Sequence, residues 1–311
     1  MNFEKCDTLM KNMASVIVGK RTAMELLVVA LLADGHALLE DVPGQGKTLM
    51  AKALARSMGG TYRRIQFTPD LLPSDITGFN VYDQRTGDFS FQPGPVMSNI
   101  LLADEINRTI PRTQSSLLES MEERQITVDG KTTPLPEPFF VMATQNPIEL
   151  EGTFPLPEAQ LDRFLLRVRL GYPDRAEEIE ILDRFQESDP LRSLEAVTSP
   201  AEIARLQRER SGILVSGHVK EYIADIAHAT RVHPSVRYGV SPRASLGLMR
   251  ASQALAALRG REYVLPDDVK ELAFPVLSHR VILTEEERLR GRTAEEILEG
   301  ILRAVPIAIR N

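Results

Sequence analysis

Apolar positions in the first part of the chain follow two alternating patterns. Residues 20–32 and 49–58 carry apolar groups at helical spacing, and Gly59-Gly60 is a suitable stop for the second of these helices. Short apolar runs lie between them and beyond them, as buried strands do. Strands separated by helices are typical of a mostly parallel, doubly wound α/β sheet. The expected strands are residues 36–40, 64–67, 99–103 and 139–143.

Two segments, near residues 79–91 and 124–135, interrupt this alternation. In the first, two short strand-like runs flank Gly87, so a hairpin is expected. In the second, an alternating run enters Asp129-Gly130, the pair that favours a type I′ turn. Neither hairpin is needed to complete a parallel sheet. They are either surface additions or fingers that face a partner or a pore.

The strand pattern ends after residue 172, and helical periodicity continues to the end of the chain. Thr293 is a suitable amino-terminal cap for the last helix, with Glu295 and Glu296 well placed in its first turn. We therefore divide the chain into an α/β core, residues 1–172, and a smaller all-helical linker and lid, residues 173–311. The expected helices are residues 175–185, 201–210, 218–230, 242–258, 266–277 and 293–304.

Composition narrows the class of protein. A hydrophobic fraction of 43% and a charged fraction of 26% are those of an ordinary globular protein, and the net charge of -6 argues against nucleic acid as a partner. The longest apolar run, residues 26–33, is too short to insert across a bilayer, and residues 1–7 lack a secretory core. Cys6, expected to be a free thiol near a mobile terminus, fits a reducing compartment. A cytoplasmic location is expected.

Residues 38–48 read as a strand, a glycine-bearing turn and the start of a helix. The ending Gly46-Lys47-Thr48 matches the phosphate-binding P-loop, in which backbone N–H groups and a helix amino terminus hold phosphates. Lys47 would reach the β- and γ-phosphates, and the Thr48 hydroxyl would bind Mg²⁺. Asp41 stands where the pattern has its first glycine. Since aspartate tolerates left-handed backbone, we expect the turn to survive, with the carboxylate pointing away from the phosphates.

A second set of polar residues follows the third strand. Asp104 would complete the Mg²⁺ shell, and Glu105 would orient or deprotonate an attacking water, which favours an ATPase over a metabolic kinase. Two carboxylates after a strand are also common on surfaces. Asp41, Asp104 and Asn146 all follow strands, and the carboxyl ends of parallel strands share one edge of the sheet. Asn146 would bond the water or the γ-phosphate, although an Asn-Pro turn forms for local reasons.

Two arginines are candidates for stabilising the transferred phosphate. Arg163 would act as an arginine finger toward the next subunit, with Arg108 and Arg112 as rivals; the alternative is an ion pair with Asp162 or a neighbouring helix. Arg243 lies in the first turn of a helix capped by Ser241-Pro242, where a cation opposes the helix dipole. A γ-phosphate at that end would reverse the penalty. The five histidines lack metal-ligand spacing, so no metal beyond nucleotide-bound Mg²⁺ is expected.

Longer runs carry a family resemblance. The chain resembles the MoxR family of AAA+ ATPases over nearly its whole length. The matching runs are RIQFTPDLLPSDITG at residues 64–78, GPV at 94–96, ADEINR at 103–108, QSSLLESMEE at 114–123, ATQNP at 143–147, LPEAQLDRF at 156–164 and SPR at 241–243.

The resemblance implies an AAA+ P-loop core with a helical lid, and ATP and Mg²⁺ as cofactors. It implies Walker A at residues 44–48, Walker B at Asp104-Glu105, sensor 1 at Asn146, sensor 2 at Arg243 and the arginine finger at Arg163. Nucleotide contacts are expected from Val18 and Gly19 beside the adenine, and from Pro43, Gly44, Gln45, Gly46, Lys47, Thr48 and Leu49 around the phosphates.

The resemblance also implies a homo-hexameric ring that hydrolyses ATP and remodels a client protein. Clients in the family are often von Willebrand factor A-domain proteins, and some members mature enzyme complexes or insert metals or cofactors. The two hairpin inserts match the helix 2 insert and the hairpin before sensor 1. The alternatives are a nucleotide-gated assembly scaffold with slow turnover and a chelatase-type or nucleic-acid motor subunit of the same clade.

Overall fold

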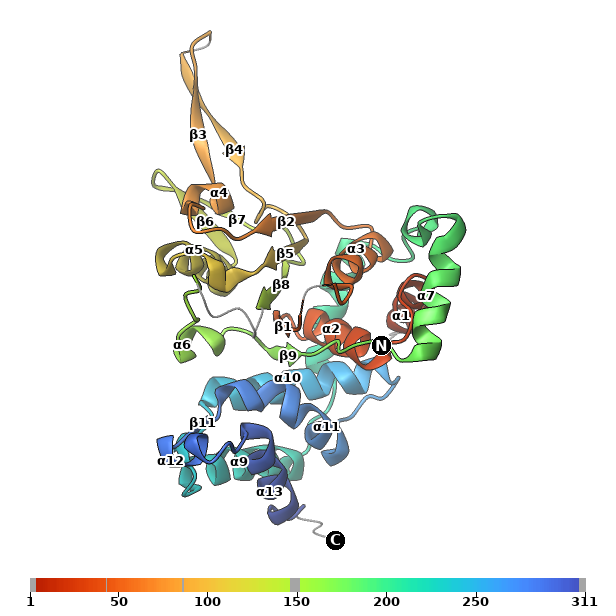
Figure 1. The fold of residues 1–311 in the computed structure, drawn as a ribbon, viewed down its shortest axis with the longest axis vertical. Coiled ribbons are helices and arrows are strands. Elements are labelled where there is room, and N and C mark those ends of the chain that lie inside the picture. The colour runs from red at the N-terminus through yellow and green to blue at the C-terminus, as the bar shows by residue number, and fades with distance from the viewer. Residues whose placement is uncertain (1–3, 43, 86, 146–151, 308–311) are drawn as a thin grey trace.

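A five-stranded parallel sheet forms the centre of the computed structural model, which describes residues 4–42, 44–85, 87–145 and 152–307 (Figure 1). The strand order is β2-β5-β8-β1-β9, so the first strand of the chain lies inside the sheet and each neighbour is reached by a crossover. The predicted α/β class is confirmed. The strands are β1 (Ala37–Glu40), β2 (Tyr62–Gln66), β5 (Ile100–Asp104), β8 (Phe140–Gln145) and β9 (Leu166–Val168).

Alternating side chains bury both faces of this sheet. Leu39 and Leu102 join the apolar cluster on the side of α2 and α3, while Leu38 and Leu101 join the cluster under α5. The edge strand β9 was not predicted, because three residues are too short to show a periodicity. The helices of this part are α1 (Glu4–Ala14), α2 (Arg21–Leu32), α3 (Lys47–Ser57), α4 (Pro73–Thr77), α5 (Pro111–Glu123) and α6 (Glu158–Leu161), with the 3-10 turn η1 (Ile106–Arg108).

The amino-terminal helix α1 was also missed, and with it the surroundings of Cys6. The thiol is fully buried in the large apolar cluster rather than lying at a mobile terminus. Burial, and after it the charge of Glu202, raises the pKa of Cys6 to about 12. The thiol is therefore a packing group, and its protonated form is inert at neutral pH.

Both predicted hairpins are present. In the second, Asp129 and Gly130 have φ angles of 48° and 78°, as a type I′ turn requires. The first is longer than expected and projects far from the body of the molecule (Figure 1). The two hairpins touch where Asn80 Nδ2 donates to Asp129 Oδ2 at 2.7 Å. Their strands are β3 (Gly78–Asp83), β4 (Asp88–Pro93), β6 (Gln125–Val128) and β7 (Lys131–Pro134).

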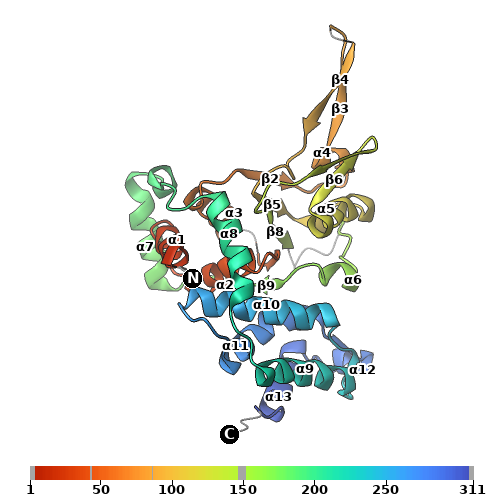
Figure 2. The same ribbon diagram turned by 180° about the vertical axis from the view of Figure 1, so that it is seen from behind.

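The helices directly after the sheet return to the core instead of joining the lid. Helix α7 (Arg175–Glu187) lies beside α1, and α8 (Pro200–Glu209) runs behind the sheet toward the lid (Figure 2). Gln207 Nε2 donates to the Leu31 carbonyl at 2.7 Å, which fixes α8 against α2. The segment is therefore a strap from the last sheet strand to the lid. It also contains the 3-10 turns η2 (Pro190–Ser193) and η3 (Arg210–Gly212).

The remaining helices form the predicted helical lid, packed under β9 and α2 (Figure 1). Their buried faces continue the apolar cluster of α1–α3, so the lid and the core share one interior. A short antiparallel ladder within the lid was not predicted. No helix in the described ranges is long and apolar enough to cross a bilayer. The lid contains α9 (Gly217–Val232), β10 (Val236–Tyr238), α10 (Pro242–Leu258), α11 (Pro266–Leu277), η4 (Ser278–Arg280), β11 (Ile282–Leu283), α12 (Glu285–Leu289) and α13 (Ala294–Ala304).

Candidate functional site

The glycine turn predicted to bind phosphates connects β1 to α3. Gly44 and Gly46 have φ angles of 88° and 84°, a region that favours glycine, and a Cβ on either would meet nothing within 4 Å. Helix α3 then begins at Lys47, so its first N–H groups lie at the turn. Pro43 lies outside the described residues. The local geometry is that of an open cradle at a helix amino terminus.

Lys47 is held at this cradle by the backbone of its own turn. Its Nζ donates to the Asp41 carbonyl oxygen at 2.5 Å. Burial lowers the pKa of Lys47, and the charges of Asp41, Asp104 and Glu105 act in the opposite direction. Burial has removed part of the water around the Lys47 ammonium. A bound phosphate would replace that water with a charged partner, and the attraction is stronger where water is excluded.

Asp41 does not use the left-handed backbone that the sequence suggested, since it is absent from the residues with positive φ. Its carboxylate accepts from the N–H of Leu170 at 2.5 Å and of Gly171 at 3.0 Å. The carboxylate is therefore committed to the segment after β9, and Asp41 is not among the residues that line the cleft of Lys47. The side chain ties the start of the glycine turn to the segment that leaves β9.

The acidic pair closes the other side of the cradle. Asp104 ends β5, and its Oδ1 accepts from the Thr144 hydroxyl at 2.6 Å. The same hydroxyl accepts from the Glu105 N–H at 2.8 Å, which supports Glu105 in a left-handed conformation with φ 57°. Non-glycine residues in that region store strain that persists only where neighbours hold them. Thr144, on the adjacent strand β8, is such a neighbour.

Two residues of β2 reach across to the acidic pair. Arg64 donates to Asp104 Oδ2 from Nη2 at 2.6 Å and from Nε at 3.2 Å, and Gln66 Nε2 donates to Glu105 Oε2 at 2.6 Å. Arg108 Nε also lies 3.1 Å from the Glu105 carboxylate. The functional reasoning from sequence missed Arg64, Gln66 and Thr144. Alternation along β2 places Arg64 and Gln66 on one face, which was the available signal.

Together these residues line a cleft of about 440 Å³. Within the described part of the chain, no three His, Cys, Asp or Glu side chains form a metal site by themselves. Mg²⁺ typically uses one or two carboxylates and completes its shell with phosphate and water. One carboxylate and one hydroxyl beside a phosphate cradle fit that requirement. The cleft is lined by Gly44, Gly46, Lys47, Thr48, Leu49, Arg64, Gln66, Asp104 and Glu105.

The structure also describes the two residues predicted to lie beside the adenine. Val18 is buried, and Gly19, with φ 61°, lies against the start of α7. A Cβ on Gly19 would come within 2.2 Å of Glu177 Oε1, so the Glu177 side chain would have to move, and the positive φ itself favours glycine. Asn146, the predicted sensor 1, lies outside the described residues.

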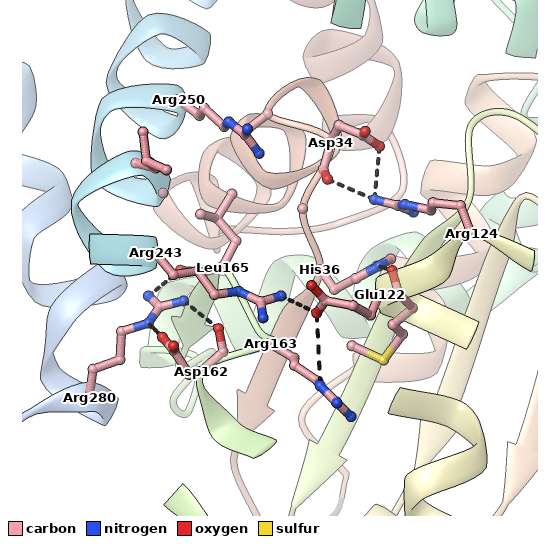
Figure 3. Close-up of a pocket in the computed structure, with 15 residues that line it drawn as sticks. Asp34, His36, Glu122, Arg124, Asp162, Arg163, Leu165, Arg243, Arg250 and Arg280 are labelled. Carbon is pink, nitrogen blue, oxygen red and sulfur yellow. Dashed lines mark hydrogen bonds and ion pairs between the residues drawn. The ribbon is translucent and has the colours of Figure 1, made fainter. Parts of the chain in front are cut away.

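Arg163 and Arg243 come together, but at a different cleft. The Glu122 carboxylate at the end of α5 pairs with Arg243 Nη2 and lies 3.8 Å from Arg163 Nε (Figure 3). Arg243 is in the first turn of α10, whose cap Ser241 has the predicted geometry. Among the lining residues described, none is shared with the cleft of Lys47. The sequence placed Arg243 at the γ-phosphate; in the structure it pairs with Glu122 and is not among the residues that line the cleft of Lys47.

This second cleft, which we call the arginine cleft, has a volume of about 480 Å³ and an excess of positive charge. Its three carboxylates each pair with arginine: Asp34 with Arg124, Asp162 with Arg280, and Glu122 with the pair above. Burial, with nearby arginines, holds the pKa of His36 well below its ordinary value, so the ring adds no charge. The surplus suits an anion. The five lining arginines are Arg124, Arg163, Arg243, Arg250 and Arg280.

The rival arginines occupy other places. Arg108 lies at the first cleft, paired with Glu105, and Arg112 is exposed in the first turn of α5. The ion-pair alternative for Arg163 is realised through Glu122, on a neighbouring helix, rather than through Asp162. Such a pair does not exclude a role in phosphate binding, because both partners are partly exposed and can separate at little cost.

The sheet order, the glycine turn, the acidic pair and the helical lid define a P-loop ATPase of the AAA class. Residues 36–166 match the family model described as ATPase family associated with various cellular activities (AAA), and residues 228–301 match the AAA lid domain. A Cytophaga hutchinsonii crystal structure superposes with a TM-score of 0.93 and 40% identity, covering 98% of this chain and 96% of that one.

Curated relatives narrow the class further. The chain is 54% identical to protein YeaC of Bacillus subtilis, covering 95% of this chain and 92% of that protein, and 44% identical to chaperone MoxR1 of Mycobacterium tuberculosis, covering 94% and 79%. The chain belongs to the MoxR family of AAA ATPases.

Proposed function

We propose that this protein hydrolyses ATP and uses the hydrolysis to remodel a client protein. The observation that carries the proposal is the meeting of Asp104 and Glu105 with Lys47 and Thr48 in one cleft. These residues come from segments far apart in the chain, and together they supply a phosphate cradle, metal ligands and a base. A phosphate-binding protein without turnover would need no carboxylate in the position of Glu105.

Each residue of the cleft has a defined task. The glycine turn and the amino end of α3 hold the phosphates, and Lys47 exchanges its bond to the Asp41 carbonyl for the β- and γ-phosphate oxygens. Thr48 and Asp104 would hold Mg²⁺, which neutralises the developing phosphate charge when bound. Glu105 orients the attacking water and accepts its proton. Val18 and Gly19 are expected to flank the adenine, and Asn146 to bond the γ-phosphate.

The arginine cleft supports assembly into a ring, with a hexamer as the expected form. Arg163 and Arg243 lie together in a positively charged cleft, away from the cradle of their own chain. A γ-phosphate presented by a second copy would bind both guanidinium groups and displace Glu122. We infer that each active site is completed by a neighbour, with Arg163 as the arginine finger and Arg243 as the lid sensor.

The projecting hairpin supports a protein client. Phe79, Tyr82 and Phe89 are 49%, 53% and 71% exposed, and the rings of Tyr82 and Phe89 contact each other at a tilt of 55°, with centroids 5.3 Å apart. Exposed aromatic groups on a projecting element are typical of protein contacts. The relative from Mycobacterium tuberculosis carries the name chaperone, which agrees with a protein client. A von Willebrand factor A-domain protein is the expected kind of client.

The substitution Glu105→Gln tests the chemistry. We expect the variant to bind ATP as the parent does and to lose about 10²–10⁴-fold in kcat, since only the base is removed. Glu119→Gln, on the exposed face of α5, is the matched control and should keep parental turnover. Full turnover in Glu105→Gln, measured as phosphate release, would remove Glu105 from the mechanism.

The same variant identifies the client. Glu105→Gln loaded with ATP should retain the client in a pull-down, and the client should be released with ADP. If the parent protein retains it equally well and turns over ATP only slowly, the nucleotide-gated scaffold is the better description. Stimulation of ATP turnover by added single-stranded or double-stranded nucleic acid would favour the motor alternative, and we expect none.

A further inference from the structure

The Asp104 carboxylate already has a cationic partner in this chain. Arg64 donates to its Oδ2 twice, from Nη2 at 2.6 Å and from Nε at 3.2 Å. The other oxygen, Oδ1, accepts from the neutral Thr144 hydroxyl at 2.6 Å. A metal ion that binds Asp104 through Oδ2 must therefore compete with the guanidinium, while the bond to Thr144 can stay in place.

The β-sheet fixes Arg64 in this position. Strands β2 and β5 are parallel neighbours, with Gln66 beside Asp104 and Arg64 beside Leu102 in the register. Residues two apart in a strand share a face, so Arg64 and Gln66 point to the same side. Arg64 Nη2 donates to Gln66 Oε1 at 2.8 Å, and Gln66 in turn donates to Glu105. The guanidinium is oriented by this chain of bonds rather than left free.

The two partners differ in exposure. The Arg64 side chain is 46% exposed and that of Asp104 is 15% exposed. The arginine can therefore move toward solvent while the carboxylate stays in the cleft. An ion pair with one exposed partner is weak enough for a divalent cation to break. Breaking it still costs free energy, so a higher concentration of the cation is needed to fill the site.

We propose that Arg64 is the resident counter-cation of Asp104 and is displaced when Mg²⁺ enters with the nucleotide. In the absence of Mg²⁺ the guanidinium neutralises the carboxylate that would otherwise repel the phosphates of ATP. Displacement of the guanidinium would leave Oδ2 free to hold Mg²⁺. Arg64 thus sets the Mg²⁺ concentration at which the site fills. The inference rests on the proposed function, because it assigns Asp104 to the metal.

The test measures binding without turnover. A fluorescent, non-hydrolysable ATP analogue is titrated at increasing free Mg²⁺, and the Mg²⁺ midpoint for tight binding is compared between variants. We expect Arg64→Gln to lower this midpoint by roughly threefold to fivefold, the upper part of the range for a partly exposed ion pair. Arg63→Gln is the matched control: it removes the same charge from the next residue, whose side chain points to the other face of β2. Its midpoint should stay within about twofold of the parent.

The outcomes separate this inference from the proposed function. An unchanged or higher midpoint in Arg64→Gln would overturn the role of Arg64 and leave ATP binding established. An equal fall in Arg63→Gln would also overturn it, because the effect would then be one of net charge. A parent protein that binds no ATP analogue at any Mg²⁺ concentration would overturn both proposals. Circular dichroism of each variant checks that the fold is kept.

Discussion

Asp41 illustrates how one residue can serve two parts of a site. Its backbone carbonyl accepts from Lys47, and its side chain accepts from the N–H groups of Leu170 and Gly171. Asp41 is only 8% exposed, so water replaces those two bonds poorly. The residue connects the phosphate turn to the strap that leads from β9 to the lid. Asp41, which stands in place of the first P-loop glycine, therefore has a structural role.

Replacing Asp41 with glycine should leave ATP binding close to the parental affinity, because the side chain faces away from the cradle. The free energy of unfolding should fall by about 1–3 kcal/mol, as expected when buried N–H groups lose a charged acceptor. Urea denaturation and nucleotide titration measure the two effects separately. Asp41→Asn, which retains one acceptor oxygen, should lose less stability. A large loss of ATP affinity in Asp41→Gly alone would show that the carboxylate shapes the turn.

Two buried histidines join elements that are distant in the chain. His36 Nδ1 accepts from the Val141 N–H at 3.0 Å, and its Nε2 lies 3.2 Å from the Met121 carbonyl, so it joins β1, β8 and α5. His279 Nε2 lies 3.1 Å from the Phe164 carbonyl and joins the lid to the segment that enters β9. Burial, followed by nearby arginines, holds the pKa of both rings well below 6.5. The folded protein keeps both rings neutral.

The two buried neutral histidines predict that the folded protein loses stability in acid. Below pH 6.5 the unfolded chain binds protons at His36 and His279 that the folded protein excludes, so stability is complete above that pH and falls on acidification. Each histidine contributes at most about 1.4 kcal/mol per pH unit. Urea denaturation between pH 7 and pH 5 measures the slope. His279→Asn should reduce it by about one proton, while His228→Asn, at an exposed position on α9, should leave it unchanged. Equal slopes in all three proteins would exclude His279 as a source of the acid sensitivity.

At the scale of the whole molecule, the two clefts are complementary in charge. The chain carries a net charge of -6, yet the arginine cleft has a surplus of positive charge. The cleft of Lys47, when it holds ATP, presents phosphates to the outside. A ring that places one cleft against the other would pair these charges at every interface and would make hydrolysis depend on assembly.

Mixing two inactive variants tests this arrangement. Lys47→Ala removes nucleotide binding, and the double substitution of Arg163 and Arg243 with alanine should lower kcat by about 10³-fold. If the arginines act on a neighbour, mixed rings contain interfaces with an intact cradle and intact arginines, and ATP turnover returns. If they act within one chain, no combination restores a complete site. Phosphate release from the mixture, compared with each variant alone, measures the difference.

The sequence by itself determined the features that depend on neighbouring residues. The glycine turn, the acidic pair at the end of β5 and the Asp129-Gly130 hairpin were all predicted, because local backbone preference and strand periodicity decide them. The caps of α10 and α13 follow the same rule: Ser241 and Thr293 each bond an N–H three residues ahead. The overall class, a parallel sheet with a helical lid, followed from these local signals.

Only the tertiary structure decided which distant residues meet. Strand pairing brings Arg64 to Asp104, and the segment after β9 brings Leu170 to Asp41. Alternation along β2 gives the face on which Arg64 lies, but it does not say which strand lies beside β2. The strap of α7 and α8 fixes the lid so that Arg243 meets Glu122 rather than Lys47. The sequence specifies the chemistry of each side chain, but the packing of separate elements determines which side chains share a cleft.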